Sequence, residues 1–282
     1  MSRPAFADSR PRLAGSGRQE TGRADSGPKP RRYAAFDIET AKQLPEDVTD
    51  ILAHRPLGVA CAAAFLADSE TARIWHGRTP DGSPAPRMGQ AEVRQMVRDL
   101  LDLAADGYTL LTWNGLGFDF DVLAEESGMP RECAELAVHH VDPLFHAVCA
   151  LGYPLSLQKA SEGMNLPGKL QGMNGSEAPA LWAEGKHREV LDYVTQDVRA
   201  TLELAVACEK RRELAWITRR GTRRYLPLPH GWLKVGEARL LPVPDTSWMS
   251  DPPSRERYTG WADEICPPTI PPGREEQLGL WA

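Results

Sequence analysis

The stretch RYAAFDIET, residues 32–40, is an apolar segment that ends in two carboxylates. Residues Tyr33–Ile38 predict a buried strand. Because residues i and i+2 lie on the same face of a strand, we expect Asp37 and Glu39 to point together while Ile38 points into the core. A structural role alone does not easily explain a carboxylate pair at the end of an apolar strand. The same Asp-x-Glu-Thr letters at residues 68–71 fall in a polar turn with Ser in the middle, and there they indicate a solvated turn.

A third carboxylate follows another apolar strand, in the stretch WNGLGFD, residues 113–119. Its glycines allow a tight turn from strand to helix, and Asp119 falls in the first turn of the predicted helix Phe118–Ser127. Asp121 competes with Asp119, because side chains two residues apart on a helix point about 200° apart and only one of them can enter the site. For either aspartate, stabilisation of the helix dipole is an equal alternative.

The fourth carboxylate, Asp197, lies with Tyr193 in the predicted helix Lys186–Lys210. The i, i+4 spacing puts both side chains on one helical face. Asp197 can therefore ligate a cation while the Tyr193 hydroxyl orients the attacking water or helps to deprotonate it. Hydrolysis of a phosphodiester fits this set of residues, because two divalent ions about 3.5–4 Å apart serve the nucleophile and the leaving oxygen. Mg²⁺ and Mn²⁺ prefer such oxygen ligands.

The ordered set of carboxylates resembles the DEDD exonucleases of the RNase H-like superfamily, in the DEDDy branch that carries tyrosine. The stretches at residues 168–170 and 174–176 are also similar to those of stand-alone, polymerase-B-like predicted 3′-5′ exonucleases. The resemblance implies two divalent cations, Mg²⁺ or Mn²⁺, single-stranded 3′ ends as substrate and nucleoside 5′-monophosphates as products. It implies these metal ligands and this water-positioning residue: Asp37, Glu39, Asp119 and Asp197, and Tyr193.

The order of predicted elements is that of an α/β protein and fits the RNase H-like architecture, a mixed central sheet flanked by helices. We expect a C-terminal irregular or β extension after it. The predicted strands are Tyr33–Ile38, Leu57–Leu66, Thr71–His76, Tyr108–Trp113 and Ala137–Val141, and the predicted helices are Met88–Ala105, Phe118–Ser127 and much of Pro143–Lys210.

Changes in composition divide the chain into four parts. Residues 1–31 are rich in Pro, Gly, Ser and Arg and predict a disordered basic arm. Residues 32–210 carry the exonuclease motifs, residues 211–262 form a C-terminal extension with a basic hairpin, and residues 263–282 form a Pro-rich linker with a terminal peptide. We expect the linker to be extended from Asp263 to Glu276.

The predicted hairpin Trp216–Leu228 turns at Arg220-Gly221 and is strongly basic. Positive charge among aromatic residues suits single-stranded nucleic acid, although a solvated basic hairpin is an equal alternative. The candidate nucleic-acid contacts are Asn114 in the turn before Asp119, and Arg219, Arg220, Arg223 and Arg224 in the hairpin.

The chain ends in the peptide QLGLWA, residues 277–282. It is similar to the Q-L-x-L-F peptide by which bacterial replication and repair proteins bind the sliding clamp, with Trp in place of Phe. Its candidate contacts are Gln277, Leu278, Leu280 and Trp281. The alternative is that this peptide folds back onto its own domain.

Bulk properties fit a cytoplasmic protein that has no role in a membrane. No apolar stretch approaches the roughly 20 residues that span a bilayer, and no secretory signal is expected. The five cysteines form no CxxC pair, which favours reduced thiols. His139, His140 and His146 are expected in the core or on the surface, and Asp142 before Pro143 is favoured as a helix cap over a metal ligand. The net charge of −6 does not by itself indicate a nucleic-acid binder.

Three functions compete. The leading one is a DNA-directed 3′→5′ exonuclease of repair, proofreading or end trimming. The second is an RNA-processing 3′→5′ exonuclease, which the catalytic motif does not exclude. The third is a non-catalytic scaffold that binds nucleic acid or a clamp, against which the complete carboxylate set argues.

Overall fold

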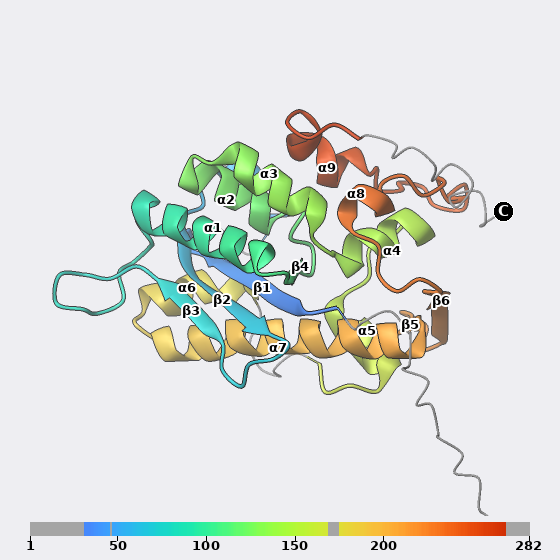
Figure 1. The fold of residues 1–282 in the computed structure, drawn as a ribbon, viewed down its shortest axis with the longest axis horizontal. Helices are drawn as coiled ribbons and strands as arrows, with labels where there is room; N and C mark the ends of the chain where they lie inside the picture. Colours follow the sequence, from blue (N-terminus) through green and yellow to red (C-terminus); the bar gives the residue numbers. More distant parts are fainter. Residues whose placement is uncertain (1–30, 46, 169–174, 269–282) are drawn as a thin grey trace, which may run out of the picture. The chain divides into compact units, whose positions relative to one another are not determined.

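A mixed central sheet forms the middle of the protein in a computed structural model that describes residues 31–45, 47–168 and 175–268. Its strands are β1 (Tyr33–Thr40), β2 (Val59–Leu66), β3 (Arg73–His76) and β4 (Thr109–Leu111). They lie in the order β3-β2-β1-β4 (Figure 1). Strand β1 pairs antiparallel with β2 and parallel with β4, and β2 pairs antiparallel with β3. The predicted fold class, a mixed sheet flanked by helices, is confirmed.

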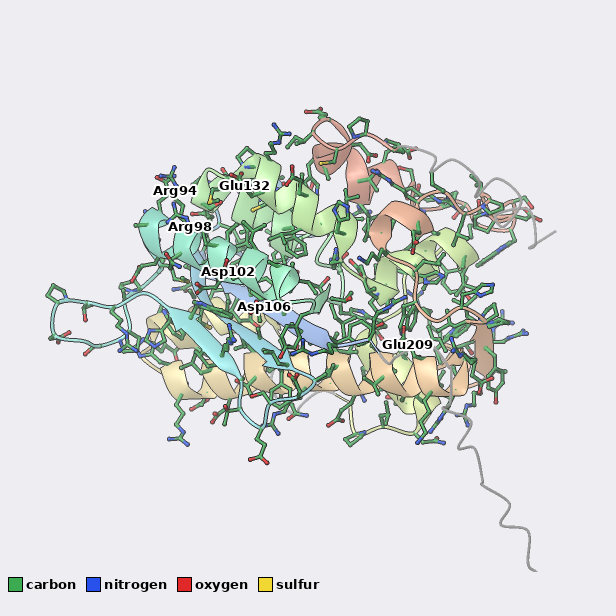
Figure 2. All side chains as sticks on the ribbon, viewed as in Figure 1. Arg94, Arg98, Asp102, Asp106, Glu132 and Glu209 are labelled. Carbon is green, nitrogen blue, oxygen red and sulfur yellow. The ribbon has the colours of Figure 1, made fainter. Side chains whose placement is uncertain are left out.

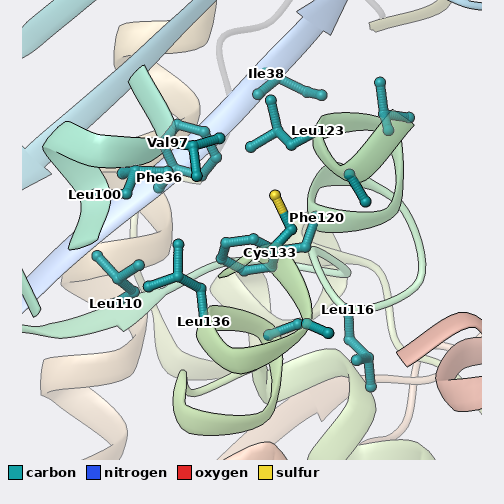
Figure 3. Close-up of a cluster of buried hydrophobic side chains, with 14 of the residues drawn as sticks. Phe36, Ile38, Val97, Leu100, Leu110, Leu116, Phe120, Leu123, Cys133 and Leu136 are labelled. Carbon is teal, nitrogen blue, oxygen red and sulfur yellow. The ribbon is translucent and has the colours of Figure 1, made fainter. Parts of the chain in front are cut away.

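Three helices cover one face of this sheet: α1 (Gln90–Ala105), α2 (Asp119–Ser127) and α3 (Pro130–His139). Phe36 and Ile38 on β1 point into the core beneath them, where Figure 3 shows Val97, Leu100 and Phe120 around them. Helix α1 follows the usual amphipathic pattern. Its apolar residues are buried, while Arg94, Arg98 and Asp102 lie along its exposed side (Figure 2).

The opposite face of the sheet packs against the long helix α7 (His187–Arg211), which contacts both β1 and β2. Tyr33 and Ala35 alternate with the residues of the first face and contact the apolar side of α7. Shorter elements complete the fold. They are the helices α4 (Pro143–Leu151), α5 (Leu157–Met164) and α6 (Ala178–Ala183), and the 3₁₀ turns η1 (Leu52–His54) and η2 (Gly175–Glu177).

The predicted strand Ala137–Val141 is wrong for most of its length, because the residues up to His139 form the end of α3. Pro130 occupies the first turn of this helix, a favoured position for proline. The buried residues that follow then recur at helical spacing. Val141 alone behaves as strand. It forms a parallel bridge with Leu111 at the edge of β4 and an antiparallel bridge with Lys234.

The C-terminal extension contains the predicted hairpin, formed by β5 (Glu213–Ile217) and β6 (Arg223–Pro227). Two short helices follow, α8 (Val235–Ala238) and α9 (Glu256–Asp263). Helix α8 packs against α3 and α4, and α9 packs against α3. The extension therefore contributes to the same apolar core as the sheet, through residues that include Val235, Ala238, Leu241 and Ala262.

Glu209 on α7 (Figure 2) fixes the start of the extension to the first strand. Its Oε1 accepts a hydrogen bond of 2.7 Å from the Tyr33 hydroxyl and one of 3.3 Å from the Trp232 amide. Arg31 completes the group by donating to the Trp232 carbonyl oxygen at 2.7 Å. One carboxylate thus joins strand β1, helix α7 and the extension.

The linker predicted from Asp263 starts inside a helix. Asp263 is the last residue of α9, and the chain continues in hydrogen-bonded turns to Cys266. Arg239 holds this segment by binding the Asp263 carboxylate and the Cys266 carbonyl oxygen. The rest of the predicted linker from residue 269, the terminal peptide and the predicted basic arm up to residue 30 lie outside the described residues. Among the described helices, none is long and apolar enough to cross a membrane.

Candidate active site at the end of the first strand

Asp37 and Glu39 belong to the face of β1 that packs against α7. They continue the alternation of Tyr33 and Ala35, whose side chains lie on that face. Cys61 on β2 pairs with Glu39 in the sheet register and belongs to the same side of the core. Burial raises the pKa of the Cys61 thiol, and the nearby charges of Glu39 and Asp37 raise it further. The two carboxylates therefore lie together above the same part of the sheet.

The register between β1 and β2 shifts directly after Glu39. Glu39 pairs with Cys61 and Thr40 pairs with Val59, so Ala60 has no partner on β1. Such a bulge bends the strand and changes where its side chains point. Its place beside Glu39 gives the sheet an irregular edge at the carboxylate pair.

The side chain of Asp119, at the start of α2, contacts strand β1. Its Oδ1 accepts a hydrogen bond of 3.0 Å from the backbone amide of Ile38, 81 residues away in the sequence. The pairing of β4 with β1 ends at Ala35, so the Ile38 amide lies beyond the pairing with β4. The Asp37 side chain lies close enough to Asp119 to influence its pKa. These contacts bring two of the predicted ligands together.

The Asp119 carboxyl is 3% exposed. Burial raises its pKa to about 7, and the hydrogen bond from the Ile38 amide opposes this effect. A cation at this point would favour the charged form of the carboxyl, because it compensates the repulsion between neighbouring carboxylates.

Asp142 stabilises the turn that precedes Asp119, at residues 113–118. The Asp142 carboxylate accepts hydrogen bonds from the backbone amides of Asn114 and Leu116 in the turn, at 3.0 and 3.1 Å. It also accepts from the amides of Leu144 and Phe145, and so caps α4. The predicted capping role of Asp142 is confirmed. Its hydrogen bonds to the turn were not predicted, because no local spacing relates residue 142 to residues 114–116.

Two residues of the turn have special backbone requirements. Asn114 has a φ of 76°, a left-handed conformation that asparagine tolerates better than most residues. At Gly115 a Cβ atom would lie 2.3 Å from the Thr112 hydroxyl oxygen, so only glycine fits. The predicted need for glycine in the tight turn is thus explained by a close approach to Thr112.

Asp119 and Asp121 have different partners in the structure. Asp121 forms an ion pair with Arg55, which also binds Glu125 on the next turn of α2. It is therefore held on the Arg55 side of the helix, whereas Asp119 turns toward β1. The sequence gives no local signal for the partnership with Arg55, which lies 66 residues away.

Tyr193 and Asp197 are buried on α7, with 3% and 5% of their surfaces exposed. Their neighbours Val194 and Val198 belong to the core between α7 and the sheet. Asp197 is thus placed on the helix that covers the Asp37 and Glu39 face. The Tyr193 hydroxyl lies near η2, 3.6 Å from the position of a Cβ atom built on Gly175.

The chemistry of these donors suits a hard divalent cation, since every one of the four predicted ligands offers carboxylate oxygen. Among the residues that the structure describes, no group of three or more His, Cys, Asp or Glu side chains is arranged so that it could hold a metal ion. Asp37 and Glu39 lie at the end of β1, Asp119 contacts this strand, and Asp197 lies on the helix that covers the same face.

The three histidines agree with the prediction of core or surface positions. His139 is exposed, whereas His140 and His146 are buried. Burial lowers the pKa of His140 to about 3 and that of His146 to about 4. His140 packs inside the protein, with Nε2 2.9 Å from the Thr112 hydroxyl and Nδ1 2.6 Å from the Ala137 carbonyl oxygen.

A cavity of about 700 Å³ lies between α4, β6 and α8, and it does not coincide with the carboxylates. Its lining is largely apolar and includes Leu226, Leu228, Leu241 and Val243. None of the predicted catalytic or metal-binding residues lines it. A site that binds cations through carboxylates, and phosphates through those cations, differs in chemistry from such a cavity, so we place the candidate site at the end of β1.

The predicted nucleic-acid contacts of the extension lie on the hairpin of β5 and β6. Arg219 and Arg220 are exposed at the hairpin turn. Arg223 lies over the Tyr225 ring at 5.6 Å, and Arg224 pairs across the hairpin with Trp216. Gln277, Leu278, Leu280 and Trp281 fall outside the described residues.

Residues 83–208 match the RNase_H_2 family model, which describes the RNase_H superfamily. The mixed sheet and its flanking helices are consistent with an RNase H-like fold. No curated protein matches the chain.

Two solved structures are similar to the chain at low identity. The family B DNA polymerase from the hyperthermophilic archaeon Pyrobaculum calidifontis matches with 22% identity and a TM-score of 0.44, over 66% of this chain and 25% of its own. A structure named Exonuclease I (apo) matches with 13% identity and a TM-score of 0.30, over 64% of this chain and 42% of its own. The chain thus spans a quarter of the first protein and less than half of the second.

Proposed function

We propose that this chain is a metal-dependent 3′→5′ exonuclease of the DEDDy type that removes nucleoside 5′-monophosphates from single-stranded nucleic acid. The observation that carries the proposal is the hydrogen bond that Asp119 accepts from the Ile38 amide, between Asp37 and Glu39 at the end of β1. It joins the two separate carboxylate motifs of the sequence at one point. The RNase H superfamily match of residues 83–208 supports the same assignment.

In this proposal Asp37, Glu39, Asp119 and Asp197 hold two divalent cations, Mg²⁺ or Mn²⁺. When bound, the cations supply an activated water and stabilise the leaving 3′-oxygen. The protein contributes the positions of the ligands. Asp142 holds the turn before Asp119, and the rigid helix α7 carries both Asp197 and Tyr193. Tyr193 orients the attacking water.

The substrate in this proposal is DNA, and the strand runs toward the basic hairpin. Arg219, Arg220, Arg223 and Arg224 contribute positive charge there, and Asn114 lies in the turn next to the carboxylates. Phosphates of a single strand are attracted to such a surface. The terminal peptide 277–282 would tether the enzyme to a bacterial sliding clamp and raise its concentration near DNA 3′ ends.

Digestion of 5′-labelled single-stranded oligonucleotides tests the activity. With Mg²⁺ or Mn²⁺ we expect a descending ladder of products from the 3′ end, and no ladder with a chelator. Matched DNA and RNA oligonucleotides separate the DNA enzyme from an RNA-processing one. Wild-type protein that is inert on every single-stranded substrate, yet binds them, would instead identify a non-catalytic scaffold.

Removal of residues 277–282 tests the tether separately. The shortened protein should give the same ladder, because these residues lie outside the domain that carries the carboxylates. Its association with a purified sliding clamp should be lost. An unchanged association would remove the clamp from the proposal and leave the nuclease.

A further inference from the structure

Trp248 is a large aromatic side chain on the surface of the C-terminal extension, with 67% of its area exposed. Its indole nitrogen donates a hydrogen bond of 3.2 Å to the Asp245 carbonyl oxygen, so the ring is fixed at one edge. Its ring meets Tyr153 edge to face, with centroids 5.9 Å apart and an angle of 82°. An exposed ring held in one orientation offers its face to a partner with little loss of side-chain entropy.

Tyr153 connects Trp248 to the basic hairpin. Its ring packs edge to face against Trp216 on β5, with centroids 6.5 Å apart. Trp216 is buried, and its cross-strand partner is the exposed Arg224. Burial raises the pKa of Tyr153, and the positive charge of Arg224 opposes this rise. Trp248, Tyr153 and Arg224 thus form one aromatic and positive surface, which we call the Trp248 platform.

A short path links the Trp248 platform to the carboxylates. Leu155 follows Tyr153 by two residues, which span roughly 7 Å at most. Its carbonyl oxygen accepts a hydrogen bond of 3.2 Å from the indole nitrogen of Trp113. Trp113 is the first residue of the turn that leads to Asp119. The platform is therefore fixed to the same turn that positions a predicted metal ligand.

The charge of this surface indicates what it binds. Arg224 belongs to a hairpin with three further arginines, Arg219, Arg220 and Arg223. Two acidic side chains lie three residues from Trp248 in sequence, Asp245 and Asp251. Asp245 accepts a hydrogen bond of 2.9 Å from the Ser247 amide and so closes its own turn. A ring face beside free positive charge matches the alternating bases and phosphates of a single nucleic-acid strand.

We propose that the Trp248 platform binds the single strand upstream of the 3′ end, with a base stacked on Trp248 and a phosphate paired with Arg224. The proposal rests on the nuclease function, which supplies the 3′ end, and it adds a second site outside the RNase H-like domain. It predicts that substrate length matters. A strand long enough to reach the platform gains affinity, and a dinucleotide does not.

Binding without cleavage tests the platform directly. The probe is a fluorescent 12-nucleotide oligo(dT), titrated in chelator against the full chain carrying Asp37→Ala. Added Trp248→Ala should weaken binding about 5- to 150-fold, the range expected for loss of one stacked base. Trp248→Phe should restore most of the affinity, because it keeps a ring face. The same pattern with oligo(U) supports the platform, since stacking needs the base and not the sugar.

Arg224 is tested by salt dependence. Arg224→Gln should reduce the slope of log Kd against log salt concentration by about 0.7, the value for one phosphate contact with a single strand. Arg98→Gln removes an exposed arginine from α1 and serves as the matched control, with an unchanged slope. Thermal melting of each variant confirms that it is folded.

The outcomes separate the platform from the nuclease. In the otherwise wild-type chain, Trp248→Ala should lower kcat/KM on the 12-mer and leave a dinucleotide unaffected. Wild-type affinity of Trp248→Ala for the 12-mer overturns the platform, whatever the nuclease assays give. Conversely, a chain that cleaves nothing but still loses affinity through Trp248→Ala keeps the platform and loses the exonuclease.

Discussion

At the scale of single residues, Asp119 is the most informative side chain, because it joins the two carboxylate motifs. Asp119→Asn preserves the shape of the side chain, and the amide oxygen can still accept from the Ile38 amide. We expect the variant to fold and to lose at least about a hundredfold in activity, since even residues that only orient metal ligands are worth 10- to 100-fold. The ladder assay measures the loss.

A second measurement shows that the loss is due to the cation. Binding of Mn²⁺ to the folded protein alone should raise the melting temperature of wild type. Asp119→Asn should reduce or abolish this increase while it melts at a similar temperature in chelator. A full Mn²⁺-dependent increase in Asp119→Asn would exclude residue 119 as a ligand.

His146 gives a prediction on pH. Burial lowers its pKa to about 4 from the ordinary 6.5, and its Nδ1 accepts from the Leu233 amide. Between about pH 6.5 and pH 4 this histidine is protonated in the unfolded chain but neutral in the folded protein. The free energy of unfolding therefore decreases as the pH falls toward 4. The contribution of this one group is about 1.4 kcal/mol per pH unit in that interval.

His146→Asn keeps an acceptor for Leu233 and removes the titration. Urea unfolding of both proteins between pH 4.5 and 8 measures the difference in their unfolding free energies. We expect that difference to be constant above pH 7 and to shift in favour of the variant as the pH falls. A difference that is independent of pH throughout would show that His146 takes up its proton equally in both states.

Single residues also show what the sequence could and could not supply. The direction of Asp37 and Glu39 follows from strand alternation, which is a local rule, and the structure agrees with it. The choice of Asp119 over Asp121 depends on Arg55, and the shape of the turn depends on Asp142. Both partners are distant in sequence, so no periodicity or spacing could reveal them.

At the scale of elements, strong periodicity was the reliable signal. Helix α1 and strands β1 and β2 lie within two residues of their predicted bounds. The failure at Ala137–Val141 came from a five-residue window, in which a short apolar run does not distinguish a helix end from a strand. The helix-forming residues before it and Pro130 belong to the same element, and only the longer window shows this.

The contact between α5 and β5 gives an element-scale prediction. A Cβ atom at Gly163 would lie 2.3 Å from the Ala215 carbonyl oxygen and from the Trp216 Cα atom. Both are backbone atoms, so they cannot rotate away. Gly163→Ala should force α5 and the basic hairpin apart and destabilise the protein by about 1–3 kcal/mol or more. Chemical denaturation measures the effect.

Gly260 in α9 is the matched control, because a Cβ atom there would meet nothing within 4 Å. Gly260→Ala should stabilise the protein by up to about 1 kcal/mol through helix propensity. If both variants changed stability equally, the backbone clash at Gly163 would not be the cause. A loss of nucleic-acid affinity in Gly163→Ala alone would also connect the docking of the hairpin to binding.

At the scale of the whole molecule, the catalytic motifs and the extension are parts of one folded unit. The sequence places a boundary near residue 210, where composition changes. In the structure, however, Trp232 is fully buried against α7, and its indole nitrogen donates to the Ala205 carbonyl oxygen at 3.2 Å. Trp261 likewise donates to the Leu116 carbonyl oxygen at 2.8 Å, within the turn before Asp119.

Two truncations test this unity. A chain that ends after Lys210 retains every predicted catalytic residue, yet it loses the residues that cover α3, α4 and the C-terminal part of α7. Burial of each large side chain contributes about 1.5–3 kcal/mol, so the loss of Trp232, Val235 and Leu241 alone removes about 5–9 kcal/mol, which is comparable with the usual stability of a whole domain, about 5–15 kcal/mol. We expect this fragment to aggregate or to show no cooperative thermal transition.

A chain that ends after Pro268 keeps both helices of the extension and the Arg239 contacts to Asp263 and Cys266. It should melt cooperatively within a few degrees of the full chain and give the same product ladder. Circular dichroism melts and the ladder assay on both truncations therefore locate the functional boundary. If the fragment ending at Lys210 melts cooperatively and cleaves, the nuclease folds and works without the extension. The Trp248 platform could then be removed without loss of the fold.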